Sequence, residues 1–206
     1  MSIVKLNNKA VSNATAFGSI SSLGSMVFIK KLTASASATL SFVHGTDGVV
    51  LDDTYKEYVF TFKDIHPSVD NSFFQFNLST DSGSNYNVAK TTTFFKTQHS
   101  ENDVYASLDY ITGSDLAQST AFQQLSTNSG NGADESCAGT MTLFNPASTV
   151  YVKHFISNTN LYHFEDLSME NFVAGYGNTT SAVDAIRFQM SSGNIDAGDI
   201  CLYGIA

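Results

Sequence analysis

The feature that most constrains the fold of this chain is an alternation of apolar and polar residues with a period of two. Residues 74–79 read FQFNLS and residues 186–190 read IRFQM. Successive side chains of a β-strand point to opposite faces, so each segment is predicted to be a strand with one buried face. Similar segments, separated by turns rich in Gly, Asn, Ser and Asp, predict about ten strands. They cover residues 26–29, 39–43, 55–63, 74–79, 91–98, 105–112, 141–144 and 149–156, with a C-terminal β-hairpin over residues 185–206.

The composition supports an all-β fold. Charged residues make up 14% of the chain, against about 25% in a typical soluble domain. Exposed helices favour Glu, Lys, Arg and Ala, whereas the 16 Phe and 9 Tyr suit pleated, half-buried surfaces. We therefore expect an antiparallel β-sandwich with at most one or two short helices. Residues 115–125 are the best helical candidate, because Leu116, Phe122 and Leu125 fall roughly on one face of a helix.

Residues 26–206 are expected to form a single β-sandwich domain, since all-β domains often reach this size undivided. Residues 1–25 show little periodicity and have two interpretations: an irregular start to the domain, or an extended N-terminal arm that reaches a neighbouring subunit. The apolar Ile3, Val4 and Leu6 near the start favour the arm, and we expect them to be partner contacts. No signal-peptide core or membrane-spanning run is expected.

The last strand of the predicted C-terminal hairpin is apolar on both faces. Cys201, Tyr203 and Ile205 alternate with Ile200 and Leu202. A strand of this kind is expected where a second layer or another subunit covers the outer face. We therefore expect Cys201, Tyr203 and Ile205 to be contacts in a homo-oligomer, with a trimer favoured.

The charge excludes two classes of partner. The chain carries a net charge of −9 and has one arginine, Arg187. A protein that binds nucleic acid needs a basic stripe to neutralise phosphates, and binding to an anionic membrane surface is not expected for the same reason. Membrane insertion is not expected either, because no run is long enough to span a membrane. The acidity is best interpreted as a means of solubility. Cys137 and Cys201 are too few for a disulfide scaffold and are expected to be free thiols in a reducing cytosol.

Catalytic residues are not expected. A glycan hydrolase needs two carboxylates about 5–10 Å apart across a cleft, and acidic residues in turns more often cap backbone amides. The sequence has no G-x-S-x-G, no P-loop and no complete G-x-G-x-x-G, because the third glycine after Gly175-Tyr176-Gly177 is missing. The carboxylates considered are Asp52, Asp53, Glu57, Asp103, Asp109, Glu165 and Asp166.

Three groups of residues have metal-ligand chemistry. On a strand, His99, Glu101 and Asp103 would lie on one face, but residues 100–103 look like a turn, which breaks this alignment. The other groups are His163 with Glu165 and Asp166, and Asp47 with Asp52 and Asp53 as a Ca²⁺ candidate that lacks EF-hand spacing. We expect no metal and no cofactor.

Tyrosines in or beside loops offer a second kind of binding site. Such rings can form a platform for carbohydrate, or they can pack on the edge of the sandwich, and the absence of Trp favours packing. The residues concerned are Tyr86, Tyr105, Tyr162 and Tyr176.

Several segments together resemble a known family. Residues 144–146 read FNP, residues 151–155 read YVKHF, residues 172–176 read FVAGY, and residues 190–205 read MSSGNIDAGDICLYGI. From about Met26 to the end, this pattern resembles small virion structural proteins of tailed bacteriophages, especially marine ones. The resemblance implies a jelly-roll-like β-sandwich that is made in the host bacterial cytoplasm and displayed on the virion, and it brings no catalytic residues.

Together these observations predict a non-enzymatic structural protein of the virion. The first expectation is a capsid decoration or cement protein that acts through oligomeric contacts with other virion proteins of the capsid or tail. The alternative is a tail-fibre or head-fibre tip that binds a host-surface glycan, with loops carrying the specificity. A virion-associated glycan hydrolase is the third interpretation.

Overall fold

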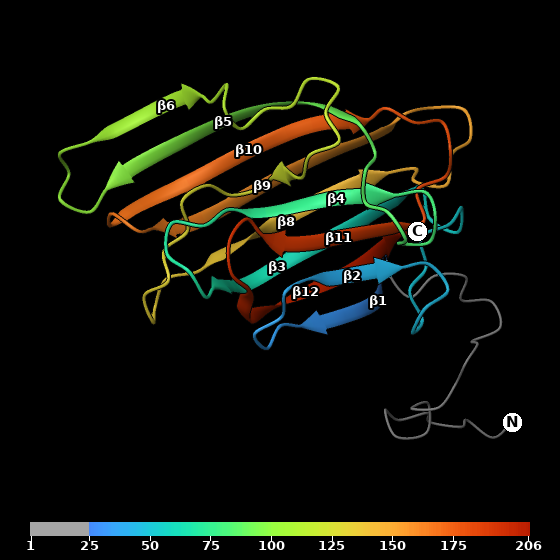
Figure 1. The fold of residues 1–206 in the computed structure, drawn as a ribbon, viewed down its shortest axis with the longest axis horizontal. Coiled ribbons are helices and arrows are strands. Elements are labelled where there is room, and N and C mark those ends of the chain that lie inside the picture. Colours follow the sequence, from blue (N-terminus) through green and yellow to red (C-terminus); the bar gives the residue numbers. More distant parts are fainter. Residues whose placement is uncertain (1–24) are drawn as a thin grey trace, which may run out of the picture.

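The computed structural model describes residues 25–206, which form twelve β-strands and no helix (Figure 1). This part of the chain therefore offers no helix long and apolar enough to cross a membrane. The strands are β1 (Met26–Thr33), β2 (Leu40–Val43), β3 (Glu57–Pro67), β4 (Phe74–Ser79), β5 (Lys90–Ser100), β6 (Ala106–Tyr110), β7 (Gln123–Gln124), β8 (Cys137–Phe144), β9 (Lys153–His163), β10 (Leu167–Gly177), β11 (Ala185–Met190) and β12 (Ile195–Ile205).

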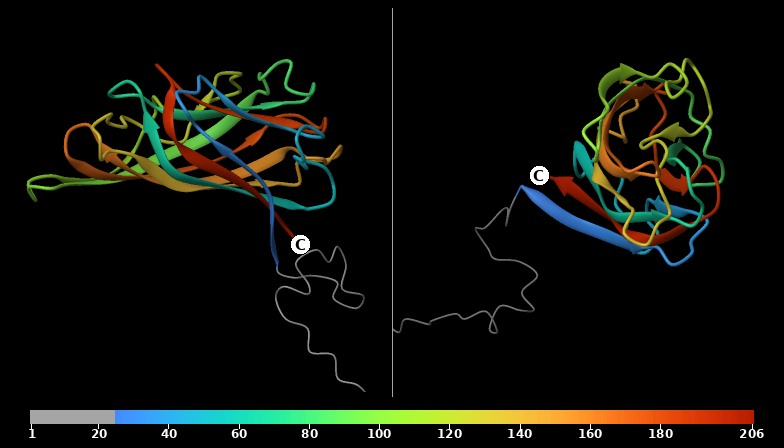
Figure 2. Two further views of the ribbon diagram at one scale, coloured as in Figure 1. Left: turned by 90° about the horizontal axis from the view of Figure 1, so that it is seen from below. Right: turned by 90° about the vertical axis from the view of Figure 1, so that its left-hand side faces the viewer.

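The strands form two antiparallel sheets that pack face to face. The larger sheet has eight strands in the order β1-β12-β3-β8-β9-β10-β5-β6, and the smaller has four in the order β2-β11-β4-β7. The end-on view shows the two layers around a common interior (Figure 2). The expected antiparallel β-sandwich is confirmed.

The connectivity is that of a jelly roll. Strands pair in a nested series, first with last: β1 with β12, β2 with β11, β3 with β8, and β4 with β7. Successive members of this series alternate between the sheets, as in a long antiparallel hairpin rolled up on itself. Four strands of the roll, β1-β12-β3-β8, lie in the larger sheet, and the other four make up the smaller sheet.

Two hairpins are inserted into this roll. β5 and β6 come between β4 and β7, and β9 and β10 come between β8 and β11. All four strands add to the larger sheet beyond β8, and we call them the extension. In Figure 1 the extension lies along the upper part of the molecule and its two turns project at the left. The segments expected as strands over residues 141–144 and 149–156 pair with each other as parts of β8 and β9, and β9 begins at Lys153.

The expected hairpin over residues 185–206 is wrong. β11 lies in the smaller sheet, where Phe188 pairs with Phe76 and Leu40, whereas β12 lies in the larger sheet, where Leu202 pairs with Phe60. Residues 191–194 therefore cross between the layers. The two strands lie in opposite layers of the sandwich, and an alternation with period two does not distinguish that arrangement from two neighbours in one sheet.

The short helix expected over residues 115–125 is also absent from the structure. The backbone of this segment bonds to β5 instead of to itself: the Leu116 amide donates to Thr92 Oγ1 at 2.8 Å, and the Thr92 amide donates to the Leu116 carbonyl at 2.9 Å. Lys90 and Ser119 exchange a further pair of backbone hydrogen bonds. Because these tertiary bonds satisfy the peptide groups, the segment has no need of helical bonds.

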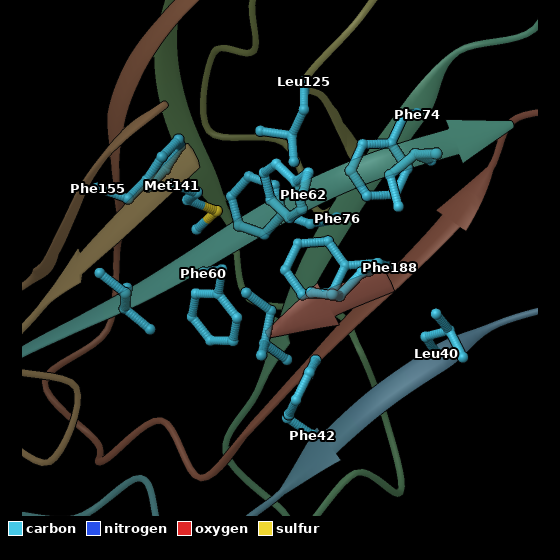
Figure 3. Packing of buried hydrophobic residues seen from close by; sticks show 14 of the residues in the cluster. Leu40, Phe42, Phe60, Phe62, Phe74, Phe76, Leu125, Met141, Phe155 and Phe188 are labelled. Atoms are coloured by element: carbon cyan, nitrogen blue, oxygen red, sulfur yellow. The ribbon is translucent and has the colours of Figure 1, made fainter. Parts of the chain in front are cut away.

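The core lies between the two sheets and is centred on Phe188 (Figure 3). Its ring centroid lies 5.4 Å from those of Phe60 and Phe62 in the facing sheet and 5.7 Å from that of Phe74 in its own sheet. Such aromatic pairs add to the free energy gained from burial alone. Strands from the first and last thirds of the chain thus share one hydrophobic cluster.

Candidate functional site

The larger sheet presents one face to the core and one face away from the smaller sheet, which we call the outer face. Residues paired directly across antiparallel strands point to the same side. One such row crosses five strands and then continues into β10 and β5. It consists of Phe28, Tyr203, Val59, Thr142 and Ile156.

A second row carries the outer face to the far edge of the extension. It ends in Phe172, Phe95 and Tyr110, on β10, β5 and β6. The rings of Phe95 and Phe172 stack at 4.7 Å with 10° between their planes. Large apolar side chains therefore occur on this face from the β1 edge to the β6 edge, and Ile156 near the middle is 57% exposed.

The three C-terminal residues expected to be partner contacts lie on the outer face. Ile200 and Leu202 are fully buried in the core, and Cys201, Tyr203 and Ile205, which alternate with them, are partly exposed. Tyr203 meets Phe28 edge to face with centroids 5.7 Å apart, and Ile205 pairs with Met26. The other three expected contacts, Ile3, Val4 and Leu6, lie outside the described residues.

Charged side chains on the outer face are largely paired with neighbours. Lys31 and Asp199 form an ion pair at 3.2 Å at one corner, and Glu170 accepts a hydrogen bond from the Asn158 amide at 2.9 Å. Threonines occupy many of the positions between the apolar side chains. The face therefore combines apolar side chains with short hydroxyls, which cost less to desolvate than charged groups do.

The second candidate region is the end of the extension, where the turns of its two hairpins lie side by side. The Glu101 amide donates to the Asp166 carbonyl at 3.1 Å, which ties the β5–β6 turn to the β9–β10 turn. Asp103 and Asp166 adopt left-handed conformations, with φ of 59° and 58°. Such residues are typical of tight hairpin loops, so both carboxylates belong to turns.

The structure brings together, at this tip, two groups of residues that are far apart in the sequence. They are His99, Glu101 and Asp103 with Tyr105 from one turn, and Tyr162 and His163 with Glu165 and Asp166 from the other. Within residues 25–206, however, no three side chains of His, Cys, Asp or Glu gather as metal ligands. His99 Nε2 instead lies 3.0 Å from Asp103 Oδ1.

The other candidate residues lie elsewhere. Tyr86 packs beneath the Arg187 guanidinium, whose carbon is 3.9 Å from the ring centroid. This tyrosine therefore packs on the sandwich, which is the interpretation that the absence of Trp favoured. Asp52 accepts from the Thr54 amide at 2.8 Å, and its hydrogen bonds to Thr54 lower the pKa of its carboxyl. Asp47, Asp53 and Glu57 lie between β2 and β3 or at the start of β3, Asp109 lies in β6, and Tyr176 lies near the end of β10.

A cavity of about 450 Å³ lies on the core-facing side of this tip, and we call it the tip pocket. Its volume falls in the range of small-molecule sites. Its lining includes the polar residues Lys96, Gln98, Asn102, Tyr105, His163 and Glu165.

Histidine 163 is the most buried polar residue of the tip pocket, at 5% exposed. Its Nδ1 accepts a hydrogen bond from the Glu165 amide at 3.1 Å, so the proton of the neutral ring lies on Nε2. Burial lowers the pKa of His163, which favours this neutral form at pH 7.

Two buried lysines were not anticipated from the sequence. Lys90 and Lys153 flank Gly177 in register on the core-facing side of the larger sheet. Lys90 Nζ donates to Asn77 Oδ1 at 2.5 Å and Lys153 Nζ donates to the Thr179 carbonyl at 3.2 Å. Burial lowers the pKa of Lys90 to about 7. A lysine at the start of a strand carries no sequence signal that its side chain turns inward.

Both cysteines are free. Cys137 is fully buried, and burial raises the pKa of its thiol to about 12. Cys201 is partly exposed on the outer face.

Comparisons with known proteins add no relative to these observations. Scans against protein-family models, curated proteins and solved structures each found no significant match for this chain.

Proposed function

We propose that this chain is a non-enzymatic structural protein of a bacteriophage virion, a capsid decoration or cement protein that assembles through the outer face of its larger sheet. The observation that carries the proposal is the outer face, which no other layer of residues 25–206 covers and on which aromatic and aliphatic side chains extend from β1 to β6. Exposed apolar patches of more than a few hundred Å² mark interaction sites. The placement in a virion rests on the sequence resemblance described above.

The outer face is large enough to support a stable complex. Eight strands about 4.8 Å apart, with lengths from five to eleven residues at ~3.3 Å per residue, give a face of roughly 1,200 Å². A standard interface buries about 800 Å² on each partner. We infer a closed homo-oligomer, with a trimer favoured, in which each copy contributes this face.

The N-terminal arm is proposed as a second contact. Residues 1–24 contain Lys5 and Lys9 and no acidic residue; since the whole chain carries −9, the remaining residues carry −11. A basic, partly apolar segment is therefore joined to an acidic domain beside the β1 edge of the outer face. Attraction to an acidic neighbour favours binding of this arm to another copy of the chain or to the capsid. Many such weak contacts together give strong attachment, because the assembly is multivalent.

The proposal is tested on purified particles. Immunogold labelling with an antibody to this chain is expected to decorate the head, and mass spectrometry is expected to detect the chain in particles. Particles that lack the chain would overturn the virion assignment. Label restricted to the tail or to fibres would overturn the capsid-decoration function and favour host adhesion by a fibre.

Host-glycan binding by a fibre tip is the second candidate function, because the structure contains a polar pocket at the end of the extension. Saturable binding to host cells or to their polysaccharide favours this function. A virion-associated glycan hydrolase is the third, and release of products from the same polysaccharide tests it.

A further inference from the structure

The tip pocket lies away from the surface proposed for assembly. It opens on the core-facing side of the larger sheet, near the ends of β5 and β9, whereas the outer face lies on the other side. Figure 1 shows these strand ends reaching past the smaller sheet at the left of the molecule. A complex formed through the outer face would therefore leave the pocket open to solvent.

Internal hydrogen bonds hold the polar walls of the pocket in place. Both amide hydrogens of Gln98 are used, since Nε2 donates to Tyr105 Oη at 2.9 Å and to Ser107 Oγ at 3.0 Å. Asn102 Oδ1 accepts from Ser100 Oγ at 2.8 Å and from the Val104 amide at 3.1 Å. Gln98 Oε1 and Asn102 Nδ2 remain as one fixed acceptor and one fixed donor, which is the arrangement of a preorganised site.

Three further groups complete the set of donors and acceptors. Because Nδ1 of His163 accepts from the Glu165 amide, the ring presents Nε2–H as a donor. The Lys96 ammonium and the Glu165 carboxylate also line the pocket, and neither makes an ion pair with another described residue. The lining therefore carries one cation, one anion and a neutral imidazole, so its net charge is zero.

The rim of the pocket is less polar. Tyr105 is 48% exposed and Val104 is 82% exposed, in the turn that closes one side of the pocket. An aromatic ring and a methyl-bearing side chain offer apolar surface beside the polar floor.

We propose that the tip pocket binds one neutral sugar residue. Each sugar hydroxyl both donates and accepts hydrogen bonds, which matches a pocket with fixed groups of both kinds, and the apolar C–H face of a sugar suits the Tyr105–Val104 rim. A phosphate would meet the Glu165 carboxylate, and a cation would meet Lys96. An apolar ligand would leave the polar floor unpaired, at a cost for each buried group. This inference deepens the second candidate function and does not depend on assembly through the outer face.

The first experiment is an NMR titration of the full chain, labelled with ¹⁵N, at neutral pH. The probes are the methyl glycosides of glucose, galactose, mannose and N-acetylglucosamine. At least one is expected to give saturable shifts confined to residues 96–105 and 163–167, with a Kd in the millimolar range, roughly that of a single weak site. The absence of a saturable shift with any of the four up to roughly 0.1 M, which limits the free energy of binding to less than about 1.4 kcal/mol, overturns the proposal.

The second experiment compares variants in the lining of the pocket with a control variant on the other side of β5. Lys96→Met and Glu165→Gln remove charged groups from the pocket, and each is expected to weaken binding at least about tenfold, as loss of a hydrogen bond to a charged group does. His99→Ala is the matched control, because His99 lies on the opposite side of β5. It is expected to leave the Kd within about twofold, as surface substitutions outside a site do.

Unchanged binding by both Lys96→Met and Glu165→Gln, with well-dispersed spectra that show folded protein, would place the sugar elsewhere and overturn the site. Binding of glucuronate or glucosamine in the absence of binding of any neutral glycoside would overturn the assignment to a neutral ligand. Oligomeric state and presence in particles are measured separately, so failure of the sugar site is distinguishable from failure of the proposed assembly.

Discussion

Phe95 and Phe172 stack face to face across β5 and β10, with their ring centroids 4.7 Å apart, on a sheet face that no other described layer covers. A cross-strand aromatic pair contributes about 0.2–1 kcal/mol to the stability of a sheet. Phe95 nevertheless remains 40% exposed. Aromatic residues are enriched at the cores of protein interfaces, and this stack joins the outer faces of the two inserted hairpins.

The outer-face interface predicts a specific loss of assembly. Ile156→Lys places a charge near the middle of the outer face and is expected to dissociate the oligomer, because an unpaired charge is costly to desolvate. Val150→Lys is the matched control: Val150 is 68% exposed but lies between β8 and β9, off the face. Light scattering coupled to size-exclusion chromatography measures the masses. Equal masses for wild type and Ile156→Lys would contradict the interface.

The core predicts a large effect at Phe188. Phe188→Ala removes a fully buried ring that meets rings of both sheets, and it is expected to lower the free energy of unfolding by about 3–5 kcal/mol. Phe28→Ala on the exposed β1 edge is expected to cost less than about 1 kcal/mol in the monomer. Urea denaturation of both variants measures the difference, and similar losses would contradict the assigned core.

The buried Lys90 predicts that stability rises with pH. Burial depresses its pKa to about 7 in the folded state, whereas an unfolded lysine has a pKa near ~10.4. Between these values the unfolded chain binds more protons, so the cost of burying the charged form is fully present below about pH 7 and is relieved as pH rises. From pH 7 to about 9.5 the contribution of this group rises by up to about 1.4 kcal/mol per pH unit.

Lys90→Met isolates this contribution. The variant fills a similar volume, and Asn77 Oδ1 keeps its hydrogen bond from the Leu78 amide at 2.9 Å. The free energy of unfolding of Lys90→Met is therefore expected to depend less steeply on pH over the same window. Parallel pH profiles for the two proteins would show that Lys90 titrates normally.

The two thiols are expected to react at different rates. Cys201 is partly exposed, whereas Cys137 is buried with a raised pKa, and the thiolate is the reactive form. Cys201→Ser is expected to react with a thiol reagent only after denaturation, and Cys137→Ser is expected to react while folded. Assembly through the outer face is expected to slow the reaction of Cys201, and equal rates in the oligomer and in monomeric Ile156→Lys would contradict that prediction.

The arm predicts a separation of folding from incorporation. Removal of residues 1–24 is expected to leave the β-sandwich folded, because its core lies within residues 25–206, but to abolish incorporation into particles. The double variant Lys5→Glu, Lys9→Glu tests the charge contribution without shortening the chain. Circular dichroism follows the fold and mass spectrometry of particles follows incorporation; normal incorporation of the truncated chain would refute the arm.

Several features of the fold could be predicted from short-range pattern. The alternation in residues 74–79 and 186–190 identifies strands, because side chains of a half-buried strand alternate between core and exterior. The same alternation placed Cys201 and Tyr203 on the opposite side of the last strand from Leu202, as the structure shows. The pattern over residues 115–125 predicted the wrong structure, because the hydrogen bonds that hold this segment come from β5, and no local pattern contains them.

The sequence by itself determined the all-β class, the position of most strands and which side of the last strand faces the core, because those properties depend on the chemistry of near neighbours along the chain. Only the tertiary structure decided that β11 and β12 lie in different sheets, that two inserted hairpins widen one sheet, and that His163 lies with Lys96 in one pocket. These relations join residues that are distant in the sequence. They depend on which strands pair and on where each layer ends, and an alternation of period two is the same for every pairing.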